Sequence, residues 1–298
     1  MSEKPGRLLW GIPGTVAETL EHKEKPVLTA WDLFALIRRS YRDAGREIPP
    51  PAELRRVVFV LKDRNIIRPD LDYPQHYRVV AVPNLPSDDI VCLLDRFCYI
   101  SHLSAMQRWG LTDRIPEPLI ISRPDDKTVS SMATSIMDKE DSETPWKYRP
   151  DRMPASSFHL HNLAHPRQVR NRTVKLHKSR HVGSSVRDRS GFARISTIGQ
   201  TFLDMLLQPT LCGGMDHVLN VWDEHAVDHL SSIISTVNSA GSIIKCRAGY
   251  IIEERLGVSD QHVEKWKSSV QRGGSRVLDS KRPYAPVWSE TWMISLNV

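Results

Sequence analysis

Two histidines four residues apart form the first pattern in this chain that could do chemistry. His225 and His229 enclose Asp228 in the segment HAVDH, which approximates the H-x-x-E-H order of zinc hydrolases. In that order two helical histidines bind zinc and a glutamate acts as the base. Asp228 is one methylene shorter than glutamate, and no third ligand is marked downstream. We therefore interpret the two residues as histidines on a helix surface.

Other groups of reactive residues also fall short of a catalytic site. Alternation would place His159 and His161 on one side of a strand, where they could bind a metal, but histidines among arginines more often serve a polar surface. The residues GSSVR at 183–187 are similar to the opening of nucleotidyltransferases, which need paired acidic residues to hold Mg²⁺, and only Asp188 follows. There is no P-loop, nucleophile elbow or dinucleotide fingerprint. We expect a protein that is not an enzyme and that has no metal and no cofactor.

Positive charge is concentrated in one middle stretch of the chain. The net charge is +6, and residues 147–194 carry 12 Lys and Arg against 2 Asp and Glu. The corresponding counts are 14 against 11 in residues 1–85, 6 against 11 in 86–146, and 9 against 11 in 195–298. This asymmetry indicates an anionic partner, either nucleic acid or an acidic protein.

The first 85 residues have the element order of a winged helix-turn-helix. Residues 16–23 predict a short helix, and the run TAWDLFALIRRSYRDAG predicts a second one. Thr29 is its expected N-cap, with Asp32 in the capping-box position. A third helix is expected over residues 52–65, after a triple-proline turn. The β-rich runs NIIRPD and HYRVVAV, separated by DLDYPQ, then predict a hairpin.

In a winged helix-turn-helix, the second helix of the pair lies in the major groove with its first residues nearest the base edges. Arginine there can bind guanine, while other cations hold phosphates. The DNA contacts expected from this domain are base contacts by Arg55 and Arg56, phosphate contacts by Arg39, Arg42 and Arg46, and contacts from the hairpin by Tyr73, Gln75, His76 and Arg78. Many winged helices instead bind proteins, and exposed arginines are often only solvated.

Residues 86–298 predict a larger mixed α/β domain that follows a proline-marked joint at residues 83–89. The polar segment 124–156 is expected to be a long exposed insertion. Short strands then follow, with a basic open face that could contact DNA phosphates, RNA or an acidic protein, or could simply be solvated. The basic residues expected on that face are Arg167, Arg170, Arg172, Lys175, Lys178 and Arg180.

The four cysteines show no C-x-x-C spacing, and several lie in apolar runs, as small buried residues do. No early apolar run resembles a signal peptide, and none approaches the length of a membrane span. We therefore expect a cytoplasmic protein with no membrane partner.

Several phrases, in their order along the chain, resemble the AbiEi family of antitoxins from bacterial type IV toxin–antitoxin (abortive infection) systems. They are YISHLSAMQRWGLTDRIP at residues 99–116, TFLDMLLQPTLCGGMDHV at 201–218, the helix AGYIIEERLG, and a terminal strand that ends in LNV. The resemblance includes the N-terminal winged helix and covers most of the chain. The family usually has an acidic–basic pair before the second phrase, where this chain has Gly199 and Gln200.

The resemblance implies two activities. The N-terminal domain would bind inverted repeats of double-stranded DNA upstream of its own operon and repress transcription. The C-terminal domain would oppose a co-encoded nucleotidyltransferase-like toxin, as a part of phage defence, without an assumed stable complex. Two other classes stay open: a protein-interaction module that uses a degenerate winged helix and a basic surface to bind an acidic partner, and a metal-dependent enzyme acting on nucleic acid.

Overall fold

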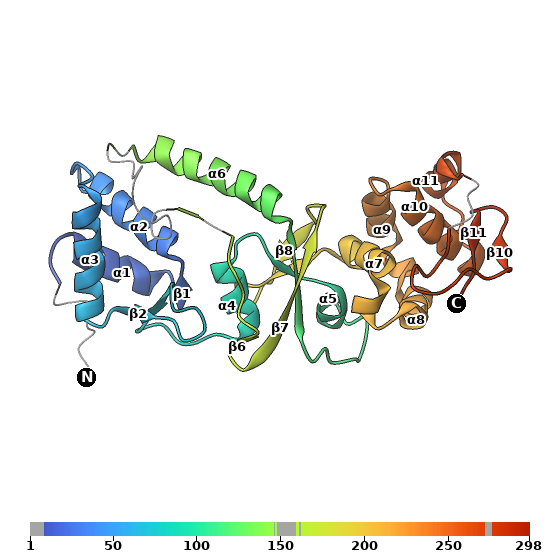
Figure 1. Ribbon diagram of the computed structural model, residues 1–298, viewed down its shortest axis with the longest axis horizontal. Helices are drawn as coiled ribbons and strands as arrows, with labels where there is room; N and C mark the ends of the chain where they lie inside the picture. The colour runs from blue at the N-terminus through green and yellow to red at the C-terminus, as the bar shows by residue number, and fades with distance from the viewer. Residues whose placement is uncertain (1–8, 146, 148–158, 161, 272–275) are drawn as a thin grey trace. The chain divides into compact units, whose positions relative to one another are not determined.

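The computed structural model describes residues 9–145, 147, 159–160, 162–271 and 276–298. It confirms the predicted mixed α+β fold class (Figure 1). The chain forms two compact units: unit 1 contains Met1–Cys98, Arg123–Val182 and Arg189–Ala193, and unit 2 contains Tyr99–Ser122, Gly183–Asp188 and Arg194–Val298. The domain boundary predicted between residues 85 and 86 falls inside unit 1, because later segments return to pack with the first 98 residues.

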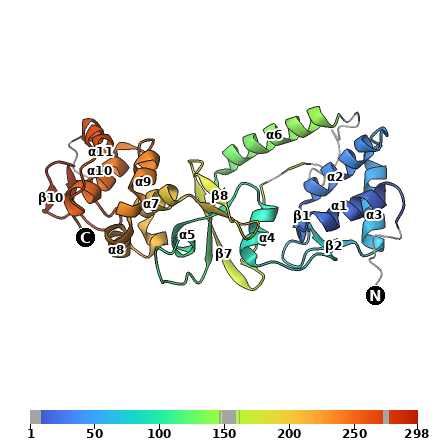
Figure 2. The same cartoon turned by 180° about the vertical axis from the view of Figure 1, so that it is seen from behind.

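Unit 1 begins with a winged helix. Its elements are α1 (Ile12–His22), β1 (Val27–Leu28), α2 (Ala30–Asp43), α3 (Pro51–Asp63), β2 (Ile67–Pro69) and β3 (Tyr77–Val79). The three strands pair antiparallel in the order β1-β3-β2. The three helices gather beside this small sheet (Figures 1 and 2). The first helix begins at Ile12, four residues before the predicted start.

Local sequence signals set the ends of the two central helices. The Thr29 side chain caps α2 by accepting the N–H of Asp32 at 3.0 Å, and its hydroxyl donates to the Asp32 carboxylate at 2.7 Å. Thr29 is therefore the predicted N-cap, and Asp32 contacts it from the capping-box position through the threonine hydroxyl. Pro51 occupies the first turn of α3, where a missing N–H removes no helical hydrogen bond. The apolar faces of both helices, including Leu33 and Leu54, enter one buried cluster.

The rest of unit 1 consists of α4 (Ser87–Leu94), α6 (Asp126–Glu143) and the hairpin of β6 (Gln168–Val169) and β7 (Arg172–Ser179). Helix α6 runs beside α2 in both views (Figures 1 and 2). Its Val129 and Ala133 are buried in a cluster with Trp31 and Phe97. The polar composition of 124–156 therefore predicted an exposed insertion but missed this helix. Residues 146 and 148–156 of that segment lie outside the described residues.

Unit 2 combines short strands with a group of helices. Strands β4 (Tyr99–Ile100), β5 (Leu119–Pro124), β8 (Ser185–Arg187) and β9 (Arg194–Ser196) lie in the order β5-β4-β9-β8, with only β4 and β9 parallel. The helices are α5 (His102–Arg108), α7 (Ile198–Leu207), η2 (Pro209–Cys212), α8 (Met215–His225), η3 (Val227–His229), α9 (Leu230–Val237), α10 (Ser242–Gly249), the π-turn η4 (Tyr250–Arg255), α11 (Gln261–Trp266) and η5 (Lys267–Ser269). The hairpin of β10 (Trp288–Ser289) and β11 (Ile294–Ser295) ends the fold.

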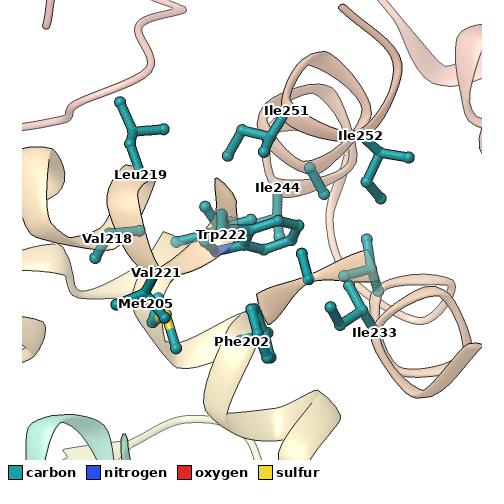
Figure 3. Packing of buried hydrophobic residues seen from close by; sticks show 14 of the residues in the cluster. Phe202, Met205, Val218, Leu219, Val221, Trp222, Ile233, Ile244, Ile251 and Ile252 are labelled. Atoms are coloured by element: carbon teal, nitrogen blue, oxygen red, sulfur yellow. The ribbon is translucent and has the colours of Figure 1, made fainter. Parts of the chain in front are cut away.

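Aromatic residues organise the core of unit 2 (Figure 3). The rings of Phe202 and Trp222 meet edge to face with centroids 5.2 Å apart, and both side chains are fully buried. Trp292 lies directly against Gly249, where a Cβ atom would come within 2.3 Å of the indole ring. Glycine at this point of α10 is therefore required for the close approach of the tryptophan.

Candidate nucleic-acid interface

Helix α3 has one buried face and one charged, exposed face. Leu54, Val57, Val58 and Leu61 are buried against the winged-helix core. The opposite face carries Ala52, Glu53, Arg55 and Arg56, all exposed, and the ring of Phe59, which is 67% exposed. The two arginines that sequence analysis assigned to base contacts thus lie on the solvent-facing side of the predicted recognition helix.

The arginines of α2 mostly face the acidic end of α6. Arg39 forms an ion pair with Glu140 at 3.3 Å. Arg42 pairs with Asp43 at 2.8 Å and donates to the backbone carbonyl of Glu143 at 3.2 Å. Both were predicted to hold phosphates, and a duplex would have to compete with these carboxylates and carbonyl groups for them. Arg46, just beyond the helix, is exposed.

The wing loop between β2 and β3 is held by an arginine from the basic stretch. Arg170 Nη2 donates to Asp70 at 2.6 Å, Nη1 contacts Asp72, and Nε donates to Asn84 at 3.1 Å. Burial disfavours ionisation of Asp70, but the hydrogen bonds and charge of Arg170 outweigh it and lower the pKa of that carboxyl. Arg170 was predicted to contact DNA, whereas its geometry is that of an internal anchor.

One residue of the same loop, Tyr73, points inward, whereas the nearby Gln75 is exposed. Tyr73 is 4% exposed, and its hydroxyl lies 2.9 Å from His165 Nδ1. His165 Nε2 in turn lies 3.0 Å from a carboxylate oxygen of Asp95. One neutral tautomer satisfies both contacts, because Nε2–H donates to Asp95 while Nδ1 accepts from Tyr73. The tip therefore does not present Tyr73 to DNA as the sequence predicted.

His76 and Arg78, two further predicted contacts from this hairpin, have internal surroundings. His76 lines a cavity of about 640 Å³ together with Trp31 and Tyr73, and burial lowers its pKa. Its Nδ1 has no hydrogen-bond partner among the described residues. Arg78 donates to the carbonyl oxygens of Pro26, at 2.8 Å, and of Val79 and Val82. Its guanidinium thus links β3 to the residue before β1 and to the segment that follows β3.

A buried polar cluster behind the wing loop was not predicted. Asp95, Cys98 and His165 bring possible metal ligands within 4.8 Å of one another. Arg123 donates to Asp95 at 3.0 Å, and both side chains are at most 3% exposed. Burial opposes ionisation of Asp95, but the hydrogen bond from His165 and the charge of Arg123 outweigh it and lower its pKa.

This cluster does not fit a cation site. The Asp95 carboxylate already faces a guanidinium, and both ring nitrogens of His165 have hydrogen-bond partners. The arrangement instead links the wing loop to α4 and to the chain before β6. Asp95 and His165 are 70 residues apart, and no local pattern in the sequence could have paired them.

Some cations of the basic stretch, residues 167–180, form ion pairs with carboxylates. Arg172 pairs with the buried Asp88 at 2.8 Å, and Lys178 pairs with Asp126 at 2.6 Å. Lys178 is nevertheless exposed, as are the other predicted contacts Arg167, Lys175 and Arg180 of this stretch. Some of the cations concentrated in this stretch therefore form ion pairs with carboxylates of unit 1.

In unit 2 the phrases at residues 99–116 and 201–218 pack into one core. The first supplies β4 and α5 and the second supplies α7, and Met106 and Phe202 belong to the same buried cluster. Asp204 of the second phrase is 6% exposed and accepts a hydrogen bond from Gln200 at 2.7 Å. Burial raises the pKa of Asp204 to about 7, against the opposing effect of that hydrogen bond.

The histidine pair considered first also lies in unit 2, at the end of α8 and in η3. His225 is near Glu224, with 3.7 Å between Nε2 and a carboxylate oxygen. The ring of His229 packs beside Phe202 with centroids 6.0 Å apart. Within the described ranges, neither histidine belongs to a group of three metal-ligating side chains.

No protein-family model matches this chain, and no curated protein matches it. Among solved structures, it is similar to the crystal structure of the RV2827C protein from Mycobacterium tuberculosis. The sequence identity is 11% and the TM-score is 0.46, with 95% of this chain and 90% of that chain covered. A similarity of this size supports no conclusion about fold or function. Every helix in the described ranges is too short or too polar to traverse a lipid bilayer.

Proposed function

We propose that this protein is a sequence-specific DNA-binding repressor that reads duplex DNA through α3. The observation that carries the proposal is the exposed Arg55–Arg56 face at the start of that helix, within the winged-helix order of elements. Recognition helices of this class contact base edges with their first turns, and arginine is the commonest partner of guanine.

Because some of the predicted arginines bind groups within the protein, fewer of them are expected to contact DNA phosphates. Phosphate contacts are assigned to the exposed cations Arg46, Arg167, Lys175 and Arg180, which do not have to leave a buried ion pair. Contacts by Arg78 and Arg170 are not part of the proposal, because their guanidiniums bind backbone carbonyls and buried carboxylates. Specific recognition then depends on α3 rather than on the tip of the wing.

We further propose that the chain is an AbiEi-type antitoxin that acts in the cytoplasm. The repressor would bind inverted repeats upstream of its own operon, and unit 2 would oppose a co-encoded nucleotidyltransferase-like toxin. The support is the order of the two phrases in the sequence and their packing in one core. On this proposal the protein is not an enzyme.

Binding of the purified protein to its own upstream DNA and to scrambled DNA, at 50 and 200 mM salt, tests the repressor. We expect sequence-selective, salt-sensitive binding. The double substitution Arg55→Ala, Arg56→Ala should weaken it by at least tenfold, since a good arginine–guanine contact contributes about 1–3 kcal/mol. Arg64→Ala, at the exposed far end of α3, is the matched control and should leave selectivity intact.

Unchanged operator affinity in the double variant would mean that the assignment of α3 is wrong. Co-expression with the toxin tests the second activity separately. The Arg55→Ala, Arg56→Ala variant should still prevent growth arrest, because the proposed antitoxin activity belongs to unit 2. If the wild-type chain does not relieve toxicity, the antitoxin proposal is refuted while the repressor proposal stands.

The anchored wing favours a second candidate function. A winged helix whose wing tip is bound by Arg170 and His165 could serve as a protein-interaction module for an acidic partner. Association with an acidic partner protein that weakens as the salt concentration rises, together with no shift of any DNA fragment, would support this candidate instead of the repressor.

A further inference from the structure

Phe59 is an aromatic residue on the wrong side of an otherwise amphipathic helix. Its ring is 67% exposed, whereas Val57, Val58 and Leu61 fill the core face of α3. The helix therefore does not need Phe59 to pack against the winged-helix core. A single exposed apolar side chain is ordinary on a protein surface, so it is the place of Phe59 among charged residues of α3 that points to a contact with a ligand.

The position of Phe59 relative to the two arginines suggests the ligand. It follows Arg55 by four residues and Arg56 by three, so the three side chains share one stripe of the helix. One helical turn advances about 5.4 Å. Successive base pairs are about 3.4 Å apart, so a helix lying along the groove would place Phe59 about one or two base pairs from the arginine contacts.

From this geometry we infer that Phe59 contacts the C5-methyl group of a thymine and makes α3 selective for thymine beside the bases read by Arg55 and Arg56. The methyl group is the apolar feature that thymine alone shows in the major groove, and phenylalanine is among its known partners. The neighbouring arginines complement a polyanionic groove. This inference rests on the proposed function, since it requires that α3 enters duplex DNA.

Replacement of thymine by deoxyuridine removes only the methyl group and leaves every hydrogen-bonding atom in place. The probe is a duplex obtained by selection of random-sequence DNA on the full-length protein, with its protected thymines replaced one at a time. We expect one thymine in each half-site at which the substitution weakens binding about fourfold, which corresponds to about 0.8 kcal/mol for one buried carbon group.

Phe59→Ala is the protein variant that completes a double-mutant cycle with the deoxyuridine substitution. Its affinity for the thymine duplex should fall, and it should bind the thymine and deoxyuridine duplexes equally, so the two changes are not additive. Phe59→Leu keeps an apolar contact and should retain part of the thymine preference. Since Phe59 is mostly exposed, both variants should unfold at the wild-type temperature, which separates lost contact from lost fold.

Each other outcome overturns the inference in a distinguishable way. If selection yields a site but no deoxyuridine substitution matters, or if Phe59→Ala keeps the wild-type thymine preference, α3 binds DNA without this contact. If Phe59→Ala abolishes self-association in sedimentation while DNA binding is unchanged, the face binds a second copy of the chain. If selection yields no preferred sequence, the proposed repressor function fails together with the inference.

Discussion

Replacement of Arg170 by alanine tests the anchored wing loop. Arg170 Nη2 lies 2.6 Å from Asp70, whose side chain is 1% exposed. Without the guanidinium, the hydrogen bonds to the Asp70 carboxylate that remain within the described part of the chain come from the backbone N–H groups of Asp72 and Tyr73, at 3.1 and 3.2 Å. Removing one partner of a buried ion pair costs about 3–5 kcal/mol. Because Arg170 is 13% exposed and two backbone hydrogen bonds remain, we expect a loss of about 3 kcal/mol.

The loss should depend on pH with a definite sign. Burial opposes ionisation of Asp70, but Arg170 lowers the pKa of this carboxyl in the folded protein. A lowered pKa contributes stability above the ordinary pKa of aspartate, and this contribution is lost as the pH falls through the folded pKa. The difference in unfolding free energy between the wild type and Arg170→Ala should therefore be largest at pH 7 and should shrink below about pH 4.

Urea unfolding at pH 7 and at several values below pH 4, with hydrogen exchange of the wing-loop amides, measures both effects. Lys178→Ala removes a cation of the same stretch from an exposed pair and should not change the unfolding midpoint. Asp70→Asn, Asp72→Asn and Arg170→Met together remove the charges from both sides and should restore most of the stability. The reasoning is refuted if Arg170→Ala unfolds like the wild type and instead lowers the salt dependence of DNA binding by about one phosphate contact.

Three further predictions follow from particular contacts. Glu140→Gln removes the charge opposite Arg39, so non-specific DNA affinity should rise and its logarithmic salt slope should steepen by up to about one in a fluorescence-anisotropy titration; an unchanged slope would show that Arg39 does not meet phosphate. The raised pKa of Asp204, about 7, means that its contribution to stability is present below about pH 4 and lost as the pH rises through 7. Asp204→Asn should therefore be more stable than the wild type at pH 8, on the order of 1–3 kcal/mol, but not at pH 4, and equal urea midpoints at pH 8 would contradict this. Gly249→Ala gains about 1 kcal/mol of helix propensity but brings a Cβ within 2.3 Å of Trp292, so we expect net destabilisation of about 1–3 kcal/mol by thermal unfolding; a stabilised variant would mean that the indole can move aside.

Patterns within a few residues predicted the winged helix well. Thr29 and Asp32 marked the start of α2, and the proline triplet marked the start of α3. The helical spacing of Leu54, Val57 and Leu61 identified the buried face of α3, and the arginines assigned to the opposite face are exposed there. Such signals are readable because caps and amphipathic spacing act over one or two helical turns.

The partners of individual charged groups could not be predicted in the same way. Arg170 and Asp72 are 98 residues apart, and Asp95 and His165 are 70 residues apart. Only the tertiary fold decides which arginine meets a carboxylate and which stays open. Helix α6 was missed for a related reason, since Val129 and Ala133 are the only residues it buries among those described, too few to create a recognisable apolar stripe.

Because Asp72 and Arg170 lie 98 residues apart, the wing loop is synthesised well before the arginine that holds it. The winged-helix core is complete within residues 9–82, so it can fold soon after that part of the chain has been made. The contact between the loop and the guanidinium can form only after Arg170 has been added, 98 residues after Asp72. At about 5–20 residues per second this takes roughly 5–20 s. A ribosome-bound chain that stops before Arg170 should therefore carry a formed recognition helix and an untied wing. Such a chain should be cut in that loop by a protease that leaves the finished protein intact.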